Sequence, residues 1–281
     1  MKPNRIVTAL QLAPASVYYS ALFGAPLILL VVYSFYTTEN FDFIPQFTLD
    51  NYVTAWTSDV YRTYFARTLR ISAITALAIA VVGFFYSYVI TYTLRAHRAV
   101  LYFLVLVSMF GGYLVRIYAW RSIFGAEGIA NSALMSTGII SEPLDLLRNG
   151  EFAIVVAMIN FYLPLGILPI YAAMQNVGPG QIEAAQDLGS SRLGAAGKVV
   201  LPLALRGVTV AFVFTFIATA AEWLTPQLLG GTEDQMIGNR IAYQFGAGFD
   251  WPLGSALAVT LVVVLALLLG AMFTLVRRWI R

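Results

Sequence analysis

The sequence predicts an all-α membrane protein with six transmembrane helices. Hydrophobic residues make up 59% of the 281 residues and charged residues 11%, so there are too few polar groups to cover a globular surface of this size. Six segments are apolar over the roughly 20 residues that a helix needs to cross the hydrocarbon core of a bilayer. A chain with this composition and these segments is expected to lie in a membrane.

The six predicted spans differ in how clearly they stand out. Three of them contain no charged residue, and the other three have more polar or proline-marked ends. The first is too long for a cleavable signal peptide, and no small-x-small cleavage site follows it. The spans are residues 12–36, 71–94, 100–121, 152–174, 203–229 and 255–276. The loops between them are too short for a separate domain, so we expect residues 1–281 to form a single transmembrane domain.

Two of the predicted spans contain residues that disturb helices. The third span contains Gly111 and Gly112, and the fourth contains Pro164 and Pro169. Breaks at such residues expose backbone polar groups, which a membrane tolerates only next to protein or water. We therefore expect irregular helices here, which either line a solute path or allow close packing through small residues.

The distribution of lysine and arginine predicts the orientation of the chain. With both termini in the cytoplasm, most of these residues fall on the inner side, as the positive-inside rule requires. The inner residues are then Lys2, Arg5, Arg95, Arg98, Arg192, Lys198, Arg206, Arg277, Arg278 and Arg281. The outer residues Arg62, Arg67 and Arg70 oppose this assignment, but four acids lie near them in the same loop. We expect cytoplasmic N and C termini.

Several classes of function are excluded by composition. The chain has no cysteine and a single histidine, His97, so it offers neither a thiolate metal site nor a histidine cluster. It also has no nucleophile, base and acid set and no Gly-x-x-x-x-Gly-Lys-Ser/Thr phosphate loop, so no catalytic residue is predicted. Its basic residues concentrate at span ends and form no stripe for nucleic acid. Energy for any transport must come from another subunit.

A polar loop, residues 175–202, separates the fourth and fifth predicted spans. The breaker cluster at 178–180 ends one helix and lets another begin. Residues 181–188 are helix-prone, with apolar side chains on one side and Glu183 and Asp187 one turn apart on another. A carboxylate in the first turn is also favoured by the helix dipole, which is a purely structural explanation of Glu183.

The second half of this loop contains signals for a bend and a new helix. Gly189 permits a bend in the backbone. Ser190 or Ser191 can cap a second short helix. Pro202 marks the position where the next span is expected to begin. A polar, bent segment between two membrane spans is suited to contact a partner outside the membrane.

The loop resembles the signature loop of permease subunits from binding-protein-dependent ABC importers. The matching residues are Glu183-Ala184-Ala185, then Gly189, then Val199-Val200-Leu201-Pro202. Val199 is a mild departure, because the family usually has isoleucine there. In that family the loop forms coupling helices that sit in a groove of the cytoplasmic ATPase. The resemblance therefore implies an ATPase-coupling site made of Glu183, Ala184, Ala185, Gly189 and Pro202.

Other segments narrow the resemblance to permeases of the spermidine/putrescine branch. They are residues 114–120, Gly128, Asn131, residues 225–231, 236–239, 244–245 and 251–256. This branch also includes importers of opines and other amino-containing solutes. The resemblance thus implies transport of a small cationic amine, such as spermidine or putrescine, or of a related amino compound.

The resemblance further implies a type I ABC importer permease fold in the bacterial inner (cytoplasmic) membrane. A periplasmic substrate-binding protein would deliver the solute, and two cytoplasmic ATPase subunits would bind ATP and magnesium. A second permease subunit, usually a different chain in this branch, would complete the pore within the lipid bilayer. The subunit itself would need no cofactor and no metal, and transport would proceed by alternating access.

Glu222 is a carboxylate placed well inside a predicted span. Burying a lone carboxylate in a membrane is costly, so it should face a protein interior or a wet cavity and meet a cation. Two interpretations are open: contact with a cationic solute, or an ion pair with Arg116 or Arg121. Aromatic rings nearby can contact a cation, although such rings more often serve packing. The candidate solute pathway comprises Glu222, Trp223, Tyr113, Trp120, Asn160 and Tyr162.

A self-sufficient secondary transporter or channel is the alternative function. In that case the loop 175–202 would be a simple amphipathic connector. Such transporters show inverted repeats and several buried ionisable groups, and this sequence shows neither plainly. The permease subunit of an ABC importer is therefore the preferred interpretation.

Overall fold

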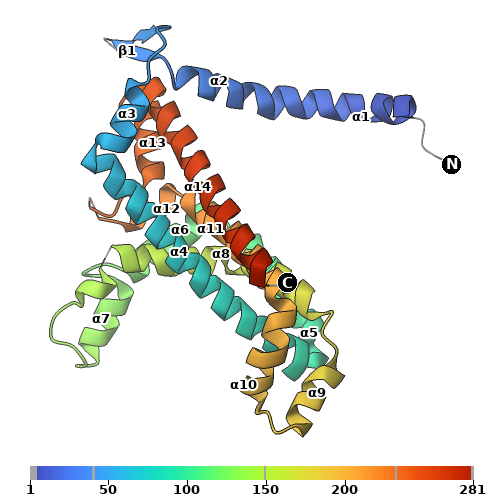
Figure 1. Ribbon diagram of the computed structural model, residues 1–281. Helices are drawn as coiled ribbons and strands as arrows, with labels where there is room; N and C mark the ends of the chain where they lie inside the picture. The colour runs from blue at the N-terminus through green and yellow to red at the C-terminus, as the bar shows by residue number, and fades with distance from the viewer. Residues whose placement is uncertain (1–4, 40–41, 149, 232, 280–281) are drawn as a thin grey trace. The chain divides into compact units, whose positions relative to one another are not determined.

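The computed structural model describes residues 5–39, 42–148, 150–231 and 233–279 (Figure 1). Among these residues, five helices are long and apolar enough to cross a membrane, and one sharply bent pair of helices makes six if it counts as a single span. The predicted all-helical membrane protein is thus confirmed. The chain forms two compact units, one of residues 64–239 and one that contains both chain ends, residues 1–63 and 240–281. Lys2 and Arg281, which support the predicted orientation, lie outside the described residues.

The unit of the two chain ends is built from long helices and one small hairpin. Its elements are α1 (Arg5–Tyr19), a π-helical turn (Ser20–Gly24), α2 (Ala25–Tyr33), β1 (Thr37–Glu39), β2 (Asp42–Ile44), α3 (Asp50–Thr57) and α14 (Trp251–Trp279). α14 packs against α2 and α3. The strands pair antiparallel, with Thr37 opposite Ile44. The hairpin was not predicted; its β-branched residues suit a short strand.

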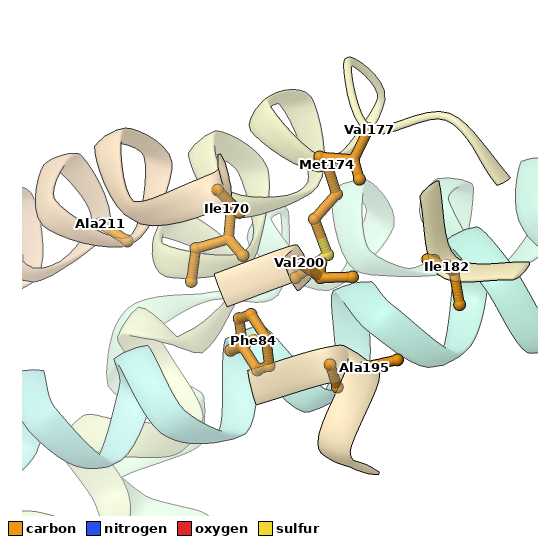
Figure 2. Packing of buried hydrophobic residues seen from close by; sticks show 10 residues of the cluster. Phe84, Ile170, Met174, Val177, Ile182, Ala195, Val200 and Ala211 are labelled. Atoms are coloured by element: carbon orange, nitrogen blue, oxygen red, sulfur yellow. The ribbon is translucent and has the colours of Figure 1, made fainter. Parts of the chain in front are cut away.

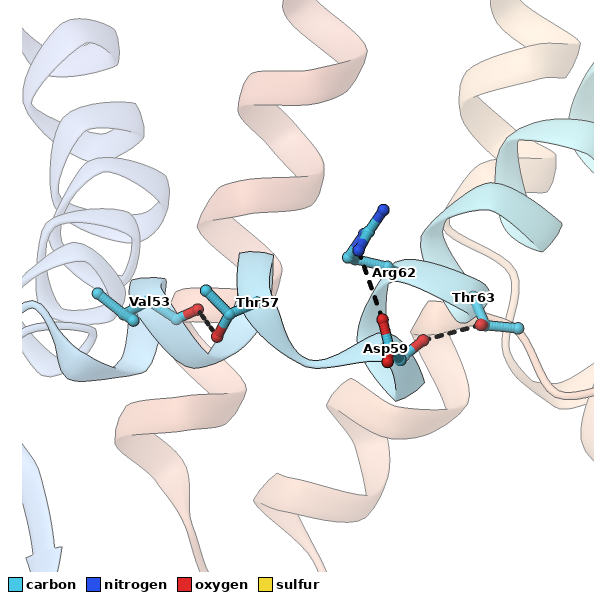
Figure 3. A network of polar contacts seen from close by, with 5 residues as sticks. All are labelled: Val53, Thr57, Asp59, Arg62 and Thr63. Atoms are coloured by element: carbon cyan, nitrogen blue, oxygen red, sulfur yellow. Dashed lines mark hydrogen bonds and ion pairs between the residues drawn. The ribbon is translucent and has the colours of Figure 1, made fainter.

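Short polar contacts order the junction between α3 and α4 (Asp59–Tyr88), as Figure 3 shows. The Arg62 guanidinium pairs with the Asp59 carboxylate at 3.4 Å, and the Thr63 hydroxyl donates to the Asp59 carbonyl at 2.8 Å. Further along α4, Arg70 forms an ion pair with Glu151. Two of the three arginines that oppose the predicted orientation therefore have acidic partners nearby.

The unit of residues 64–239 begins with α4 and a bent helix pair. α4 continues through a π-helical turn (Val89–Thr93) and a 3₁₀ turn (Arg95–His97) into α5 (Arg98–Met109) and α6 (Tyr113–Ile123). α5 and α6 meet at 92°, so the third predicted span, residues 100–121, is irregular, as expected. The break falls at Gly111 and Gly112, as the glycines suggested. A Cβ at Gly111 would lie 2.5 Å from the Arg116 guanidinium, so a larger residue there would displace that side chain.

The rest of this unit is a series of helices, and the fourth predicted span differs from the prediction. Its elements are α7 (Ile129–Ser136), a 3₁₀ turn (Asp145–Leu147), α8 (Glu151–Met174), α9 (Pro179–Asp187), α10 (Arg192–Ala195), a π-helical turn (Ala196–Val200), α11 (Leu201–Ala220) and α12 (Leu224–Leu229). α13 (Ile237–Phe245) begins in this unit, and its residues from Arg240 on belong to the other. α8 runs unbroken through Pro164 and Pro169, so no helix break occurs in the fourth span. Neighbouring helices can compensate the hydrogen bond that a proline removes.

The predicted fifth span, residues 203–229, is displaced in the structure. The helical run that can cross the membrane extends from Arg192 to Ala220 and passes through the π-helical turn just before Pro202. A π-helical turn shifts the hydrogen-bond ladder by one residue, which accommodates a residue without an N–H group. After Ala220 the chain breaks before the short helix α12. Pro202 is therefore the second residue of α11, but the helical run that includes α11 already begins at Arg192.

α8 and α11 form the central helix pair of this unit. Gly207 of α11 faces α8 so closely that a Cβ would lie 2.5 Å from both the Ala173 Cβ and the Pro169 carbonyl oxygen. Small residues at such crossings let membrane helices approach closely. A buried apolar cluster continues from this pair to the loop of residues 175–202 and includes Phe84, Ile170, Met174, Ile182 and Val200 (Figure 2). The loop is therefore packed onto the helices rather than free of them.

Candidate coupling loop and solute pathway

α9 begins where the breaker cluster predicted. Gly178 is the extended N-cap residue and Pro179 occupies the first turn, where a missing N–H group is tolerated. Ile182 is buried in the apolar cluster, whereas Glu183 and Ala184 are exposed. α9 thus attaches to the unit by one face and leaves the glutamate on the other.

The loop turns at Gly189 by a Schellman motif. Gly189 has a φ of +89°. Its N–H donates to the Gln186 carbonyl at 2.8 Å, and the Ser190 N–H donates to the Ala185 carbonyl at 3.0 Å. The Ser191 hydroxyl then caps α10 by accepting from the Gly194 N–H at 3.1 Å. The bend and the serine cap are confirmed.

Two leucines of the bend were missed by the sequence reasoning. Leu188 is 88% exposed and Leu193 is 73% exposed, one on each side of Gly189. Apolar side chains at the tip of a polar loop were the signal that could have identified them. Of the other predicted coupling residues, Ala185 is partly buried. Pro202 is exposed on α11, which is separated from α10 by the π-helical turn.

A polar cavity of about 230 Å³ lies between α9 and the end of α4. Glu183, Gln186, Arg95 and Arg192 line it together with tyrosines. The Tyr92 hydroxyl lies 3.0 Å from the Met174 carbonyl oxygen, which fixes the start of the loop to the second span. Glu183 therefore borders both solvent and a basic cavity.

The break after α11 is organised by the Glu222 carboxylate. Glu222 is 7% exposed. Its Oε1 accepts hydrogen bonds from the backbone N–H groups of the next three residues, at 3.0, 3.0 and 3.3 Å. The carboxylate thus satisfies the free N–H groups at the start of α12, as an N-terminal cap does. The acid before Thr225-Pro226 was the sequence signal for this role.

Two tyrosines complete the shell around this carboxylate. The Tyr113 hydroxyl of α6 donates to Oε1 at 2.5 Å, and the Tyr162 hydroxyl of α8 donates to Oε2 at 2.8 Å. The Tyr113 oxygen also lies 3.2 Å from the Thr225 hydroxyl. Glu222 therefore joins three helices, α6, α8 and α12.

The remaining predicted pathway residues lie at the surface of the same unit. The Trp120 indole N–H donates to Asn160 Oδ1 at 3.4 Å. Trp223 is 44% exposed, and Asn160 is exposed too. Phe161, which the sequence reasoning missed, packs edge-on against both Tyr113 and Tyr162. The structure thus gathers Glu222, Trp223 and the two tyrosines directly, with the Trp120 and Asn160 pair beside Phe161.

The two arginines considered as partners of Glu222 do not pair with it. The Arg116 guanidinium carbon lies 5.5 Å from the centroid of the Phe161 ring, a cation–π contact. Within the described residues, neither Arg116 nor Arg121 forms an ion pair with the Glu222 carboxylate. Neutral donors therefore hold this carboxylate.

Comparison with known proteins identifies the family. The family model described as "Binding-protein-dependent transport system inner membrane component" matches residues 87–281, more than half of the chain. The chain belongs to this family. This permease is also 29% identical to the spermidine/putrescine transport system permease protein PotB of Haemophilus influenzae, over 87% of this chain and 85% of that protein. It is 29% identical to the inner membrane ABC transporter permease protein YdcU of Escherichia coli, over 93% and 87%.

Solved structures show the same fold. A bacterial ABC transporter involved in the import of the acidic polysaccharide alginate matches with a TM-score of 0.79 and 17% identity, over 97% of this permease and 95% of that chain. An amino acid ABC transporter matches with a TM-score of 0.52 and 18% identity. At these identities the likeness concerns the fold alone.

Family membership fixes the general function. This permease is a multi-pass inner-membrane subunit of a binding-protein-dependent ABC importer. Subunits of this family are not catalytic and contain no cofactor. The alternative of a self-sufficient transporter is not supported, because the family works with a binding protein and with ATPases.

Proposed function

We propose that this permease translocates a small cationic amine, either a polyamine such as spermidine or putrescine or a related amino compound. The observation that carries this proposal is the similarity to PotB over 87% of the chain. The acids at Glu39, Asp42, Asp50 and Asp59, which lie outside the membrane in the proposed orientation, would attract cations to the mouth of the pore. A periplasmic binding protein selects the solute, so pore affinity is modest.

The proposed ATPase contact is the exposed face of α9 and the bend that follows it. It comprises Glu183, Ala184, Ala185 and Gly189, with Pro202 near the membrane. Support comes from the exposure of Glu183 and from the apolar anchor at Ile182, which ties α9 to the helices of the pore. When two ATPases close on ATP, α9 moves with them and tilts the attached helices. This motion exposes the pore alternately to the two sides of the membrane.

The proposed solute pathway runs past Glu222, Trp223, Tyr113, Trp120, Asn160 and Tyr162. The buried carboxylate supplies negative potential, and the exposed indole and amide groups provide surfaces that a passing amine can contact. A second permease, a different chain, forms the other half of the pore. Together with that chain, residues 1–281 act as one transmembrane domain.

Replacement of Gly189 by alanine is expected to reduce solute-stimulated ATP hydrolysis and uptake at least several-fold. The left-handed conformation at Gly189 costs an L-residue about 1–2 kcal/mol, which displaces the bend from its contact. Glu183→Ala should give a similar loss with normal membrane insertion. Both activities are measured in proteoliposomes that contain the full importer.

Gly180→Ala is the matched control for the bend. A Cβ meets nothing within 4 Å at either glycine, but only Gly189 has a positive φ. The control should keep normal ATP hydrolysis and uptake. Full activity of both Gly189→Ala and Glu183→Ala would refute the coupling role of α9.

The proposed orientation places both termini in the cytoplasm and predicts a labelling pattern. The chain has no cysteine, so single cysteines report their own position. In intact cells, Ser141→Cys and Glu233→Cys should react with a membrane-impermeant maleimide, because both residues are exposed in outer loops. Gln181→Cys on α9 should react only after the cells are opened. The opposite pattern would show that the orientation is inverted.

A further inference from the structure

A second cavity, of about 440 Å³, opens among α4, α5, α6 and α8. Its polar lining consists of Tyr86, Ser108, Arg116 and Asn160, and apolar side chains of α5 and α8 form the rest. Small-molecule sites typically measure about 300–1,000 Å³ and combine an apolar wall with a few polar groups. The cavity therefore has the size and composition of a site for a small solute.

The charge of Arg116 lacks a counter-ion in the described part of the chain. Its guanidinium lies over the Phe161 ring and against Gly111, and the ion pairs found there involve other arginines. Arginine stays charged in proteins. A charge at membrane depth is costly unless it faces a wet cavity or a partner, and such residues commonly mark solute paths.

Of the other polar lining groups, Asn160 is the one with a donor left for a ligand, because the two hydroxyls already donate their protons to backbone carbonyls. The Tyr86 hydroxyl donates to the Leu101 carbonyl, and the Ser108 hydroxyl donates to the Val105 carbonyl at 2.6 Å. Asn160 accepts from Trp120 through Oδ1, which leaves its NH₂ group to donate. A ligand that meets the guanidinium and this NH₂ group must accept hydrogen bonds. A carboxylate does so best, because it takes two parallel bonds from one arginine.

We propose that this cavity binds a carboxylate of the solute during translocation, with Arg116 as its binding residue and Asn160 as a second donor. The inference rests on the proposed function and narrows it. The solute is an amine that also has a carboxylate, rather than a bare polyamine. Arg116 receives the acidic group, and the Glu222 region provides the negative potential for the amine.

The test uses a cysteine at the cavity wall. Ser108→Cys is labelled in the purified, assembled importer with two methanethiosulfonate reagents, one with a sulfonate and one with a trimethylammonium group. A positive charge in the cavity should make the sulfonate reagent react about tenfold faster, relative to the cationic one, than it does at a control cysteine. The control is Ser136→Cys, an exposed serine whose hydroxyl also donates to the carbonyl three residues earlier.

Variants of Arg116 then test whether this residue causes the preference for the sulfonate reagent. Arg116→Gln should bring the ratio of the two rates to the control value, and Arg116→Lys should keep most of it. The proposal is overturned if Ser108→Cys, with native Arg116, reacts with the two reagents in the same ratio as the Ser136→Cys control. It is also overturned if the preference for the sulfonate reagent persists in Arg116→Gln. Protection of Ser108→Cys from both reagents in the importer but not in the isolated permease overturns it as well, because the second permease would then fill the cavity. The rates require neither ATP nor solute, so they do not depend on the coupling tests.

Discussion

Replacement of Glu222 by alanine is expected to reduce uptake to background and to destabilise the permease. The carboxylate is the acceptor for three backbone N–H groups and two tyrosine hydroxyls. Each buried donor left without an acceptor costs about 1–3 kcal/mol, so the total is among the largest that a single substitution can produce. The measurements are the thermal unfolding midpoint of the purified importer and uptake in proteoliposomes.

The conservative variant Glu222→Gln separates the structural role from the charge. Glutamine keeps one acceptor oxygen for the α12 cap, so we expect assembly to persist while uptake of a cationic solute falls about tenfold or more. The double variant Glu222→Gln/Arg116→Gln should not recover. Recovery would indicate an ion pair that forms in another state of the transport cycle. Undiminished uptake by Glu222→Gln would show that the carboxylate charge has no role in the pathway. The matched control is Glu127→Gln, which changes a glutamate in an exposed loop.

Replacement of Gly207 by valine is expected to prevent assembly. Even an alanine Cβ would lie 2.5 Å from the Pro169 carbonyl oxygen and the Ala173 Cβ, so α8 and α11 would have to separate. Overpacking costs about 1–3 kcal/mol when neighbours can adjust, and a backbone carbonyl cannot move far. The yield of monodisperse importer after gel filtration measures the effect.

Gly270→Ala is the control for this helix crossing. Gly270 also lies in a membrane helix, but a Cβ there meets nothing within 4 Å. This variant should give the yield of the native chain. If Gly207→Val gives that yield too, the close approach of α8 and α11 is not required for folding.

The sequence predicted those parts of the fold that depend on local chemistry. Pro179 at the start of α9, the bend at Gly189 and the Ser191 cap each follow from the conformation that one residue prefers. The uncharged spans follow from the length of the apolar runs. The break at Gly111 and Gly112 was signalled as well, but its 92° angle was not. Two glycines mark a position where a helix can break, but they allow many backbone conformations and so do not determine the angle.

The predictions failed where distant residues decide the structure. The ion pair of Glu222 with Arg116 or Arg121, one of two alternatives, does not form among the described residues. The donors to Glu222, Tyr113 and Tyr162, lie 109 and 60 positions away in the chain. No periodicity links such separations. Pro202 was taken as a helix start because proline suits a first turn, and the π-helical turn before it was not foreseen. The cavity at Arg116 likewise exists only after α4, α5, α6 and α8 have come together.

The helical run from Arg192 to Ala220 is continuous and has a joint, meaning a break in the helical backbone, on either side of it. Its 29 residues span about 44 Å at the usual helical rise. One joint is Gly189, whose left-handed backbone precedes α10. The other is the short break between α11 and α12, where the Glu222 carboxylate accepts backbone hydrogen bonds. Because the helix is continuous between them, we expect a push at the proposed ATPase contact to reach the break at Glu222 as a tilt of the whole helical run. Movement of the pore would then depend on how readily the hydrogen bonds from the Tyr113 and Tyr162 hydroxyls to the Glu222 carboxylate break and form again.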